Sequence, residues 1–103
     1  MDDVLMRIKR AVFAGRYALT GKAEMELDAD GLDESDVAES ILNASRIEKT
    51  IRSTSQQRER HREYLHVIRS PNFSGITIYT KGKLRQVNGE DVYYIMISAK
   101  RSR

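Results

Sequence analysis

The sequence contains no cysteine, a single proline, two histidines and no long apolar run. Without cysteine, the chain can form neither disulfides nor thiolate metal sites. No apolar stretch approaches the roughly 20 residues of a membrane-spanning helix. The first residues, MDDVLMRIKRAVFAG, are interrupted by charges where a signal peptide has an apolar stretch. These absences predict a soluble, cytoplasmic protein.

Charged residues are abundant and unevenly distributed along the chain, whose length of 103 residues predicts one domain over residues 1–103. Residues 1–43 carry ten acidic and five basic residues, a balance of −5. Residues 44–103 carry five acidic and thirteen basic residues, a balance of +8. This distribution predicts an acidic face and a basic face, and the basic face suits phosphate. The alternative is that both sets are solvated surface.

Three helices are expected in the first half, where apolar residues recur at helical spacing. The first follows Asp2 or Asp3 as its cap and ends at Gly15. The second, GKAEMELDAD, follows Thr20 and is stopped by Gly31. The third follows a capping box formed by Asp33 and Asp36.

Four strands are expected in the second half, where apolar and polar residues alternate. RIEKTI is expected at an edge of the sheet and is followed by EYLHVIRS, GITIYTKGKLRQV and EDVYYIMISAK. The last two flank Asn88-Gly89, a strong hairpin signal, and Gly82 indicates a bulge or an early turn. The sequence therefore predicts an α+β fold, with two or three N-terminal helices on one face of a four-stranded, mainly antiparallel sheet.

The helices can cover only one face of such a sheet and leave the other open to solvent or ligand. Along the last strand, the more apolar set is expected to face the helices: Tyr93, Ile95, Ile97 and Ala99. The alternate set is expected on the open face: Val92, Tyr94, Met96, Ser98 and Lys100.

The motifs of several enzyme classes are missing. The only histidines are His61 and His66, and neither an HExxH motif, a glycine-rich phosphate loop nor a serine-nucleophile motif occurs. What remains is a set of basic and phenolic residues on the expected strands: Lys49, His66, Arg69, Tyr79, Lys81, Lys83, Arg85, Tyr94 and Lys100. Taken singly, each of these residues is more often a solvent-facing or packing residue of a strand than a catalytic one.

Together, such residues can cleave RNA without a metal or other cofactor. The substrate's 2′-hydroxyl is the nucleophile, so the protein has to supply a base, an acid for the leaving 5′-oxygen and cations for the phosphorane. Lysine, histidine and tyrosine can serve these roles, but only if they converge on one open face.

The order of elements resembles the RelE-like superfamily of bacterial mRNA-interferase toxins, and most closely its MqsR-type members. The similar segments are VLMRIKRAVFAGRYALT, RIEKTI, VIRSP, GITIYTK and SAK. The middle segment, GKAEMELDADGLDESDVAESILN, also resembles a related family of toxin-like bacterial domains without assigned function. Two features depart from these patterns: Lys22 stands where the second family has histidine, and the RSTSQQRERHR loop is longer than in MqsR-type toxins.

The resemblance implies a RelE-like fold and a toxin that acts on mRNA and is neutralised by a cognate antitoxin protein. It implies catalytic roles for Lys49, Tyr79 and Lys100. His66 lies near the position of a family glutamine, and we expect it to be catalytic as well, as an acid or a base. We therefore expect a metal-independent endoribonuclease that grips phosphates through Arg58, Arg60, Arg62, Arg69, Lys81, Lys83, Arg85 and Arg101. The alternatives are an inactive toxin-like module that binds nucleic acid, or one whose basic sheet binds an acidic protein.

Overall fold

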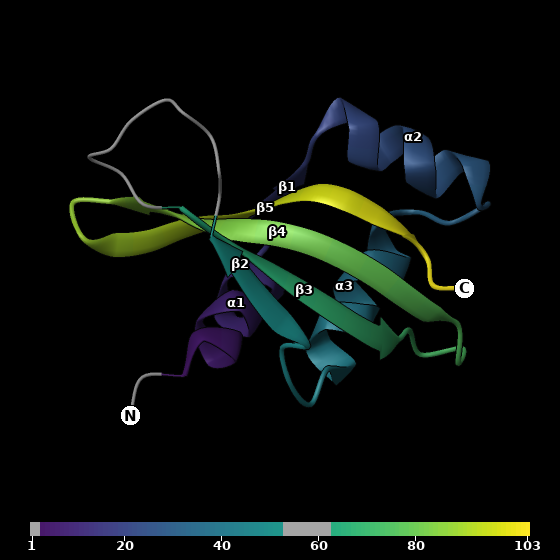
Figure 1. Ribbon diagram of the computed structural model, residues 1–103, viewed down its shortest axis with the longest axis horizontal. Helices are drawn as coiled ribbons and strands as arrows, with labels where there is room; N and C mark the ends of the chain where they lie inside the picture. Colours follow the sequence, from purple (N-terminus) through teal and green to yellow (C-terminus); the bar gives the residue numbers. More distant parts are fainter. Residues whose placement is uncertain (1–2, 53–62) are drawn as a thin grey trace.

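The computed structural model describes residues 3–52 and 63–103 and has the α+β architecture that the sequence predicts, with three helices and a five-stranded mixed sheet (Figure 1). The elements follow one another as α1 (Val4–Phe13), β1 (Tyr17–Leu19), α2 (Gly21–Ala29), α3 (Glu34–Asn43), β2 (Lys49–Arg52), β3 (Tyr64–Pro71), β4 (Thr77–Val87) and β5 (Glu90–Arg101). Among the described residues, no helix combines the length and apolarity needed to cross a membrane.

Each helix begins where a polar side chain accepts a backbone N–H that has no partner inside the helix. Asp3 accepts from Leu5 N at 3.0 Å at the start of α1, and Thr20 accepts from Ala23 N at the start of α2. Asp33 forms a capping box with Asp36 at the start of α3. The expected helix starts are confirmed at all three positions.

The sheet has the strand order β1-β5-β4-β3-β2, with β2 at one edge as predicted (Figure 1). The prediction of four strands is wrong, because β1 adds a fifth that runs parallel to β5 and pairs Tyr17 with Tyr94 and Leu19 with Met96. The other neighbouring strands are antiparallel. A three-residue strand is too short to show alternation, so no sequence pattern marked β1.

The predicted facing of β5 is wrong along its first half. Tyr94 and Met96 are fully buried in the helix-side core, whereas Tyr93 is 43% exposed. Lys81 pairs with Ser98 and Gly82 pairs with Met96, so Ile97 is an extra residue that forms a bulge. This bulge shifts the alternation, which explains why Ala99 nevertheless lies in the core as expected.

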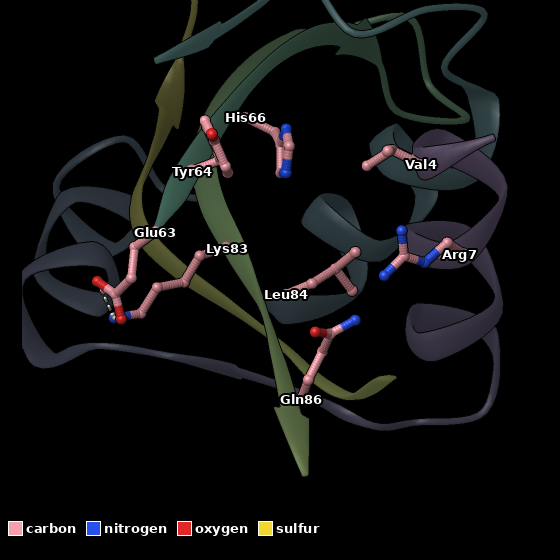
Figure 2. A pocket seen from close by; sticks show the side chains of 8 residues that line it. All are labelled: Val4, Arg7, Glu63, Tyr64, His66, Lys83, Leu84 and Gln86. Carbon is pink, nitrogen blue, oxygen red and sulfur yellow. Dashed lines mark hydrogen bonds and ion pairs between the residues drawn. The ribbon is translucent and has the colours of Figure 1, made fainter. Parts of the chain in front are cut away.

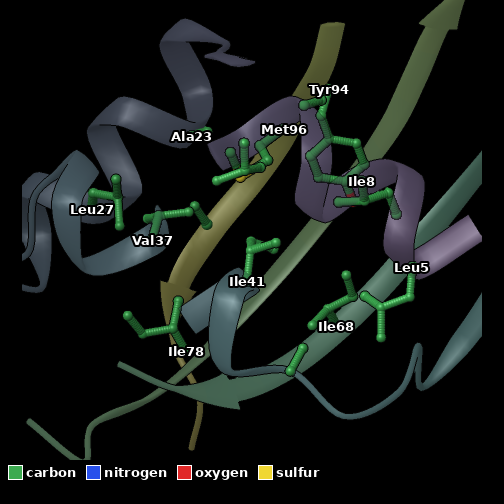
Figure 3. Packing of buried hydrophobic residues seen from close by; sticks show 14 of the residues in the cluster. Leu5, Ile8, Ala23, Leu27, Val37, Ile41, Ile68, Ile78, Tyr94 and Met96 are labelled. Atoms are coloured by element: carbon green, nitrogen blue, oxygen red, sulfur yellow. The ribbon is translucent and has the colours of Figure 1, made fainter. Parts of the chain in front are cut away.

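The core lies between the helices and one face of the sheet. α1 and α3 pack against this face, and α2 lies along β5 (Figure 1). The cluster contains residues from every helix and from β3, β4 and β5, among them Leu5, Ile8, Ala23, Leu27, Val37, Ile41, Ile68, Ile78, Tyr94 and Met96 (Figure 3). Among the described residues, no helix packs against the opposite face of the sheet, which is called the open face below.

Candidate nucleic-acid interface

The open face carries a row of cations along β4. Ile78, Thr80 and Gly82 are buried toward the helices, so the alternate residues of β4 lie on the open face: Tyr79, Lys81, Lys83 and Arg85. Strand register then sets their neighbours. One row across the sheet joins Arg69, Tyr79 and Lys100, and the next joins Lys49, Val67 and Lys81.

Tyr79 is flanked by two cations from the neighbouring strands. The guanidinium carbon of Arg69 lies 5.3 Å from the centroid of the Tyr79 ring, and Nζ of Lys100 lies 5.5 Å from it. Both distances are within cation–π range. Glu48 also contacts this row, because its Oε1 lies 3.6 Å from Nε of Arg69. The row therefore combines an aromatic ring, two cations and one carboxylate.

A groove of about 480 Å³ opens beside this row. It is lined by Arg69, Tyr79 and Lys100 together with the C-terminal residues Arg101, Ser102 and Arg103. Four of these six residues carry a positive charge, so the groove has the charge that phosphate groups require. Arg103 is partly engaged, since it forms an ion pair with Asp30 at 3.2 Å.

The row that contains Lys49 has an apolar centre. Val67 is fully buried although it does not belong to the helix-side core. Its register neighbours are Lys49, which is exposed, and Lys81, which is half-buried. The aliphatic stems of two lysines can cover a valine while their ammonium groups remain in water. Lys49 thus lies on the same face as Tyr79 and Lys100, one row further along the sheet.

Two acidic residues of α2 bind the outer edge of β5 on either side of Lys100. Beyond Met96, where the pairing with β1 ends, the outward N–H groups of β5 need other acceptors. Glu26 accepts from Ala99 N at 3.1 Å and from the Ser98 hydroxyl, and Asp30 accepts from Arg101 N at 2.8 Å. Glu26 and Asp30 are four residues apart, which is about 6 Å along a helix, and Ala99 and Arg101 are two residues apart, which is about 7 Å along a strand. The spacing of the two carboxylates therefore matches that of the two N–H groups.

The other residues that the sequence predicts to bind phosphate do not gather at one place. Some lie on or beside the open face, and the rest fall outside the described residues. Lys83 forms an ion pair with Glu63 at 3.2 Å, and Arg85 is exposed further along β4. Arg101 lines the groove beside Lys100. Arg58, Arg60 and Arg62, and also His61, fall in the segment 53–62 and lie outside the described residues.

The structure corrects the placement of His66. This residue pairs with Gly82, lies on the helix side of the sheet and is only 7% exposed. His66 is two residues before the core residue Ile68 on the same strand, so both side chains point to the same face of the sheet. Its Nδ1 lies 3.0 Å from the Thr50 hydroxyl. Burial, and to a lesser degree the positive charge of Arg7, lower the pKa of His66 below its usual 6.5. His66 therefore does not join Lys49, Tyr79 and Lys100.

Several residues at the interface were not expected from the sequence. Ser102 and Arg103 line the groove, and Glu48 pairs with Arg69. The sequence indicated Glu26 and Asp30 only through the acidic charge of residues 1–43. A spacing of four residues between acids is common on exposed helices, so it did not indicate a bonded sheet edge.

Within residues 3–52 and 63–103, no three histidine, aspartate or glutamate side chains gather closely enough to hold a metal ion. No protein-family model, curated protein or solved structure shows significant similarity to the chain. The chemistry of the open face, which presents cations, a phenol and a strand held at its edge by α2, is the feature that indicates a function.

Proposed function

We propose that the protein binds RNA on the open face of its sheet and cleaves it without a metal ion, as the endoribonuclease toxin of a bacterial toxin–antitoxin pair. The observation that carries this proposal is the row Arg69–Tyr79–Lys100, which borders a groove with two further arginines. Cations beside an aromatic ring suit a phosphate backbone and its bases.

The cleavage step needs groups that the open face can offer. The 2′-oxygen attacks the neighbouring phosphorus, its proton passes to a base, and the 5′-oxygen leaves with a proton from an acid, which yields a cyclic phosphate and a 5′-hydroxyl end. Arg69 and Lys100 can stabilise the charge of the phosphorane. Lys49 and the Tyr79 hydroxyl are the proton-exchanging groups that we assign to the base and acid roles as a pair.

Neutralisation by an antitoxin follows from the same surface. The groove and β4 together present a basic strip on the open face of the sheet. An acidic or amphipathic segment of a cognate antitoxin would complement this strip and exclude RNA from it.

Incubation of purified protein with end-labelled single-stranded RNA, with and without EDTA, tests the proposal. We expect cleavage that chelator does not reduce and that Lys100→Ala and Tyr79→Phe lower by at least tenfold. Arg10→Ala removes one exposed cation from α1, on the other side of the sheet, and is the matched control that should retain activity. Cleavage that EDTA abolishes, or that Lys100→Ala leaves unchanged, would contradict the proposal.

Binding without cleavage is the second candidate function, and the position of His66 favours it. Histidine is the side chain best suited to proton transfer near neutral pH, and His66 lies on the helix side. In this case the basic face would hold RNA, affinity would fall steeply between about 50 and 200 mM salt, and no products would form. Fluorescence anisotropy with the same labelled RNA separates the two functions, and absence of binding at low salt rejects both.

A further inference from the structure

A second recess lies between α1 and the strands β3 and β4, away from the Tyr79 groove. It has a volume of about 220 Å³ and is lined by Val4 and Arg7 of α1, by Leu84 and Gln86 of β4, and by Glu63, Tyr64, His66 and Lys83. Figure 2 shows the side chains of Arg7, His66, Leu84 and Gln86 directed into the same space. Glu63 and Lys83 also line the recess, and they form an ion pair with each other at 3.2 Å on the other side of β4 from Arg7 (Figure 2).

The polar groups of this recess favour a negative ligand. Arg7 brings a guanidinium, which has five N–H donors and is always charged. Because Nδ1 of His66 meets the Thr50 hydroxyl at 3.0 Å, Nε2 is the ring nitrogen that can meet a ligand. The Gln86 amide and the Tyr64 hydroxyl add neutral donors.

The walls of the recess set the size and character of the ligand. Val4 and Leu84 supply apolar surface on opposite sides, from α1 and β4 (Figure 2). A volume of about 220 Å³ is below the usual range for drug-sized ligands, so it suits a group of a few heavy atoms. An oxyanion attached to a short apolar body fits both the donors and the walls.

We propose that this recess binds a small oxyanion, a carboxylate or phosphate group on a short apolar body, between Arg7 and His66. The site is independent of the proposed ribonuclease activity, because it shares no lining residue with the groove beside Tyr79. The anion accepts hydrogen bonds from the Arg7 guanidinium and from Nε2 of His66.

Anion binding is coupled to the protonation of His66. Burial and Arg7 keep the pKa of this ring below 6.5, and an anion beside the ring favours its charged form. Among the described residues, the other charged or titratable groups that line the recess are Arg7 from α1, Lys83 from β4, Tyr64 at the start of β3 and Glu63 just before it. β2 contributes the neutral Thr50. The pKa of His66 should therefore rise when the site is occupied.

NMR titration of the whole chain tests the proposal, with inorganic phosphate, acetate and butyrate as separate probes. We expect a saturable shift of the His66 ring resonances with a Kd of about 1 mM or lower for at least one probe. The preferred probe shows whether the site selects phosphate or carboxylate. Arg7→Met should weaken this binding at least tenfold, while Arg10→Met on the same helix should leave it unchanged.

Lys100→Ala keeps the test separate from the ribonuclease proposal, because it alters the groove beside Tyr79 and should leave anion binding intact. If Arg7→Met fails to fold, the wild-type protein still tests the proposal, because its His66 resonances should saturate with probe concentration and the pKa of His66 should rise. Shifts that stay linear with probe concentration, or an unchanged His66 pKa at the highest probe concentration, would reject the site.

Discussion

Nζ of Lys100 lies 5.5 Å from the ring centroid of Tyr79, its register partner on the adjacent strand. The two residues are 21 positions apart in the sequence, and antiparallel pairing of β4 with β5 brings them together. Arg69 approaches the same ring from β3. This contact defines the centre of the interface on which the functional proposal depends.

Lys100→Ala should weaken RNA binding and reduce the slope of its logarithmic salt dependence by about one unit, because one phosphate contact is lost. The free energy of unfolding should change by less than about 1 kcal/mol, since the cation–π contact is at the surface. Anisotropy titrations at several salt concentrations, with thermal unfolding as the stability check, measure both effects. An unchanged salt slope would place RNA elsewhere on the molecule.

Gly82→Ala should destabilise the fold by about 1–3 kcal/mol, because an added methyl group overpacks the sheet. A Cβ atom at this position would lie 2.7 Å from the carbonyl oxygen of Ile95 and 2.8 Å from Cζ of Tyr94, and the Tyr94 ring is fully buried. Gly21→Ala is the matched control, since no atom lies within 4 Å of its added Cβ. Urea denaturation compares the two variants, and equal midpoints would contradict this account.

Glu26→Gln should lower stability at neutral pH by about 1 kcal/mol, because the charged acceptor of Ala99 N and of the Ser98 hydroxyl is lost. Burial acts to raise the pKa of Glu26, but hydrogen bonds from Ser98, Lys22 and Ala99 outweigh it, so the pKa lies below its usual 4.5. A lowered folded-state pKa stabilises the protein above the unfolded value, and this contribution disappears as the pH falls through the folded value.

The difference in stability between wild type and Glu26→Gln should therefore be largest above pH 4.5 and shrink below it. Thermal unfolding across a pH series measures this difference. Glu24→Gln, at an exposed position of the same helix, is the control and should change stability less at neutral pH. A gap between wild type and Glu26→Gln that widens on acidification would show that the carboxylate does not act as described.

Asn72→Ala should destabilise the protein by about 1–3 kcal/mol, because it leaves buried polar groups without partners. Asn72 is only 2% exposed, and its side chain accepts from Ser74 N and Ile76 N and donates to Asp36. These bonds join the turn between β3 and β4 to α3. Ser74→Ala alters an exposed neighbour in the same turn and should have little effect in the same denaturation measurement.

The parts of the fold that depend on neighbouring residues were predictable from the sequence. Thr20 and Asp33 marked helix starts because capping involves residues two or three positions apart. Asn88, with a φ of 55°, and Gly89, with a φ of 81°, form the predicted hairpin turn between β4 and β5. The facing of β5 was not predictable, since one extra residue at Ile97 reverses its alternation.

The candidate site was predictable only in part. Tyr79 and Lys100 lie together on the open face, and Lys49 lies one row away. His66 does not join them, because the alternation of β3 gives it the phase of Ile68, and the sequence alone did not say which phase faced the helices. Glu26 and Asp30 bond the edge of β5 across about 70 residues of chain, a relationship that no local pattern contains.

The sequence by itself determined the α+β class, the helix starts, the closing hairpin and the concentration of positive charge in the strand-forming half, because each depends on composition or on residues a few positions apart. Tertiary structure alone decided the fifth strand, the face on which each strand residue lies and the identity of the residues that meet beside Tyr79. The physical reason is that register and bulges are set by pairing between distant segments, and a shift of one residue moves a side chain from one face of a sheet to the other.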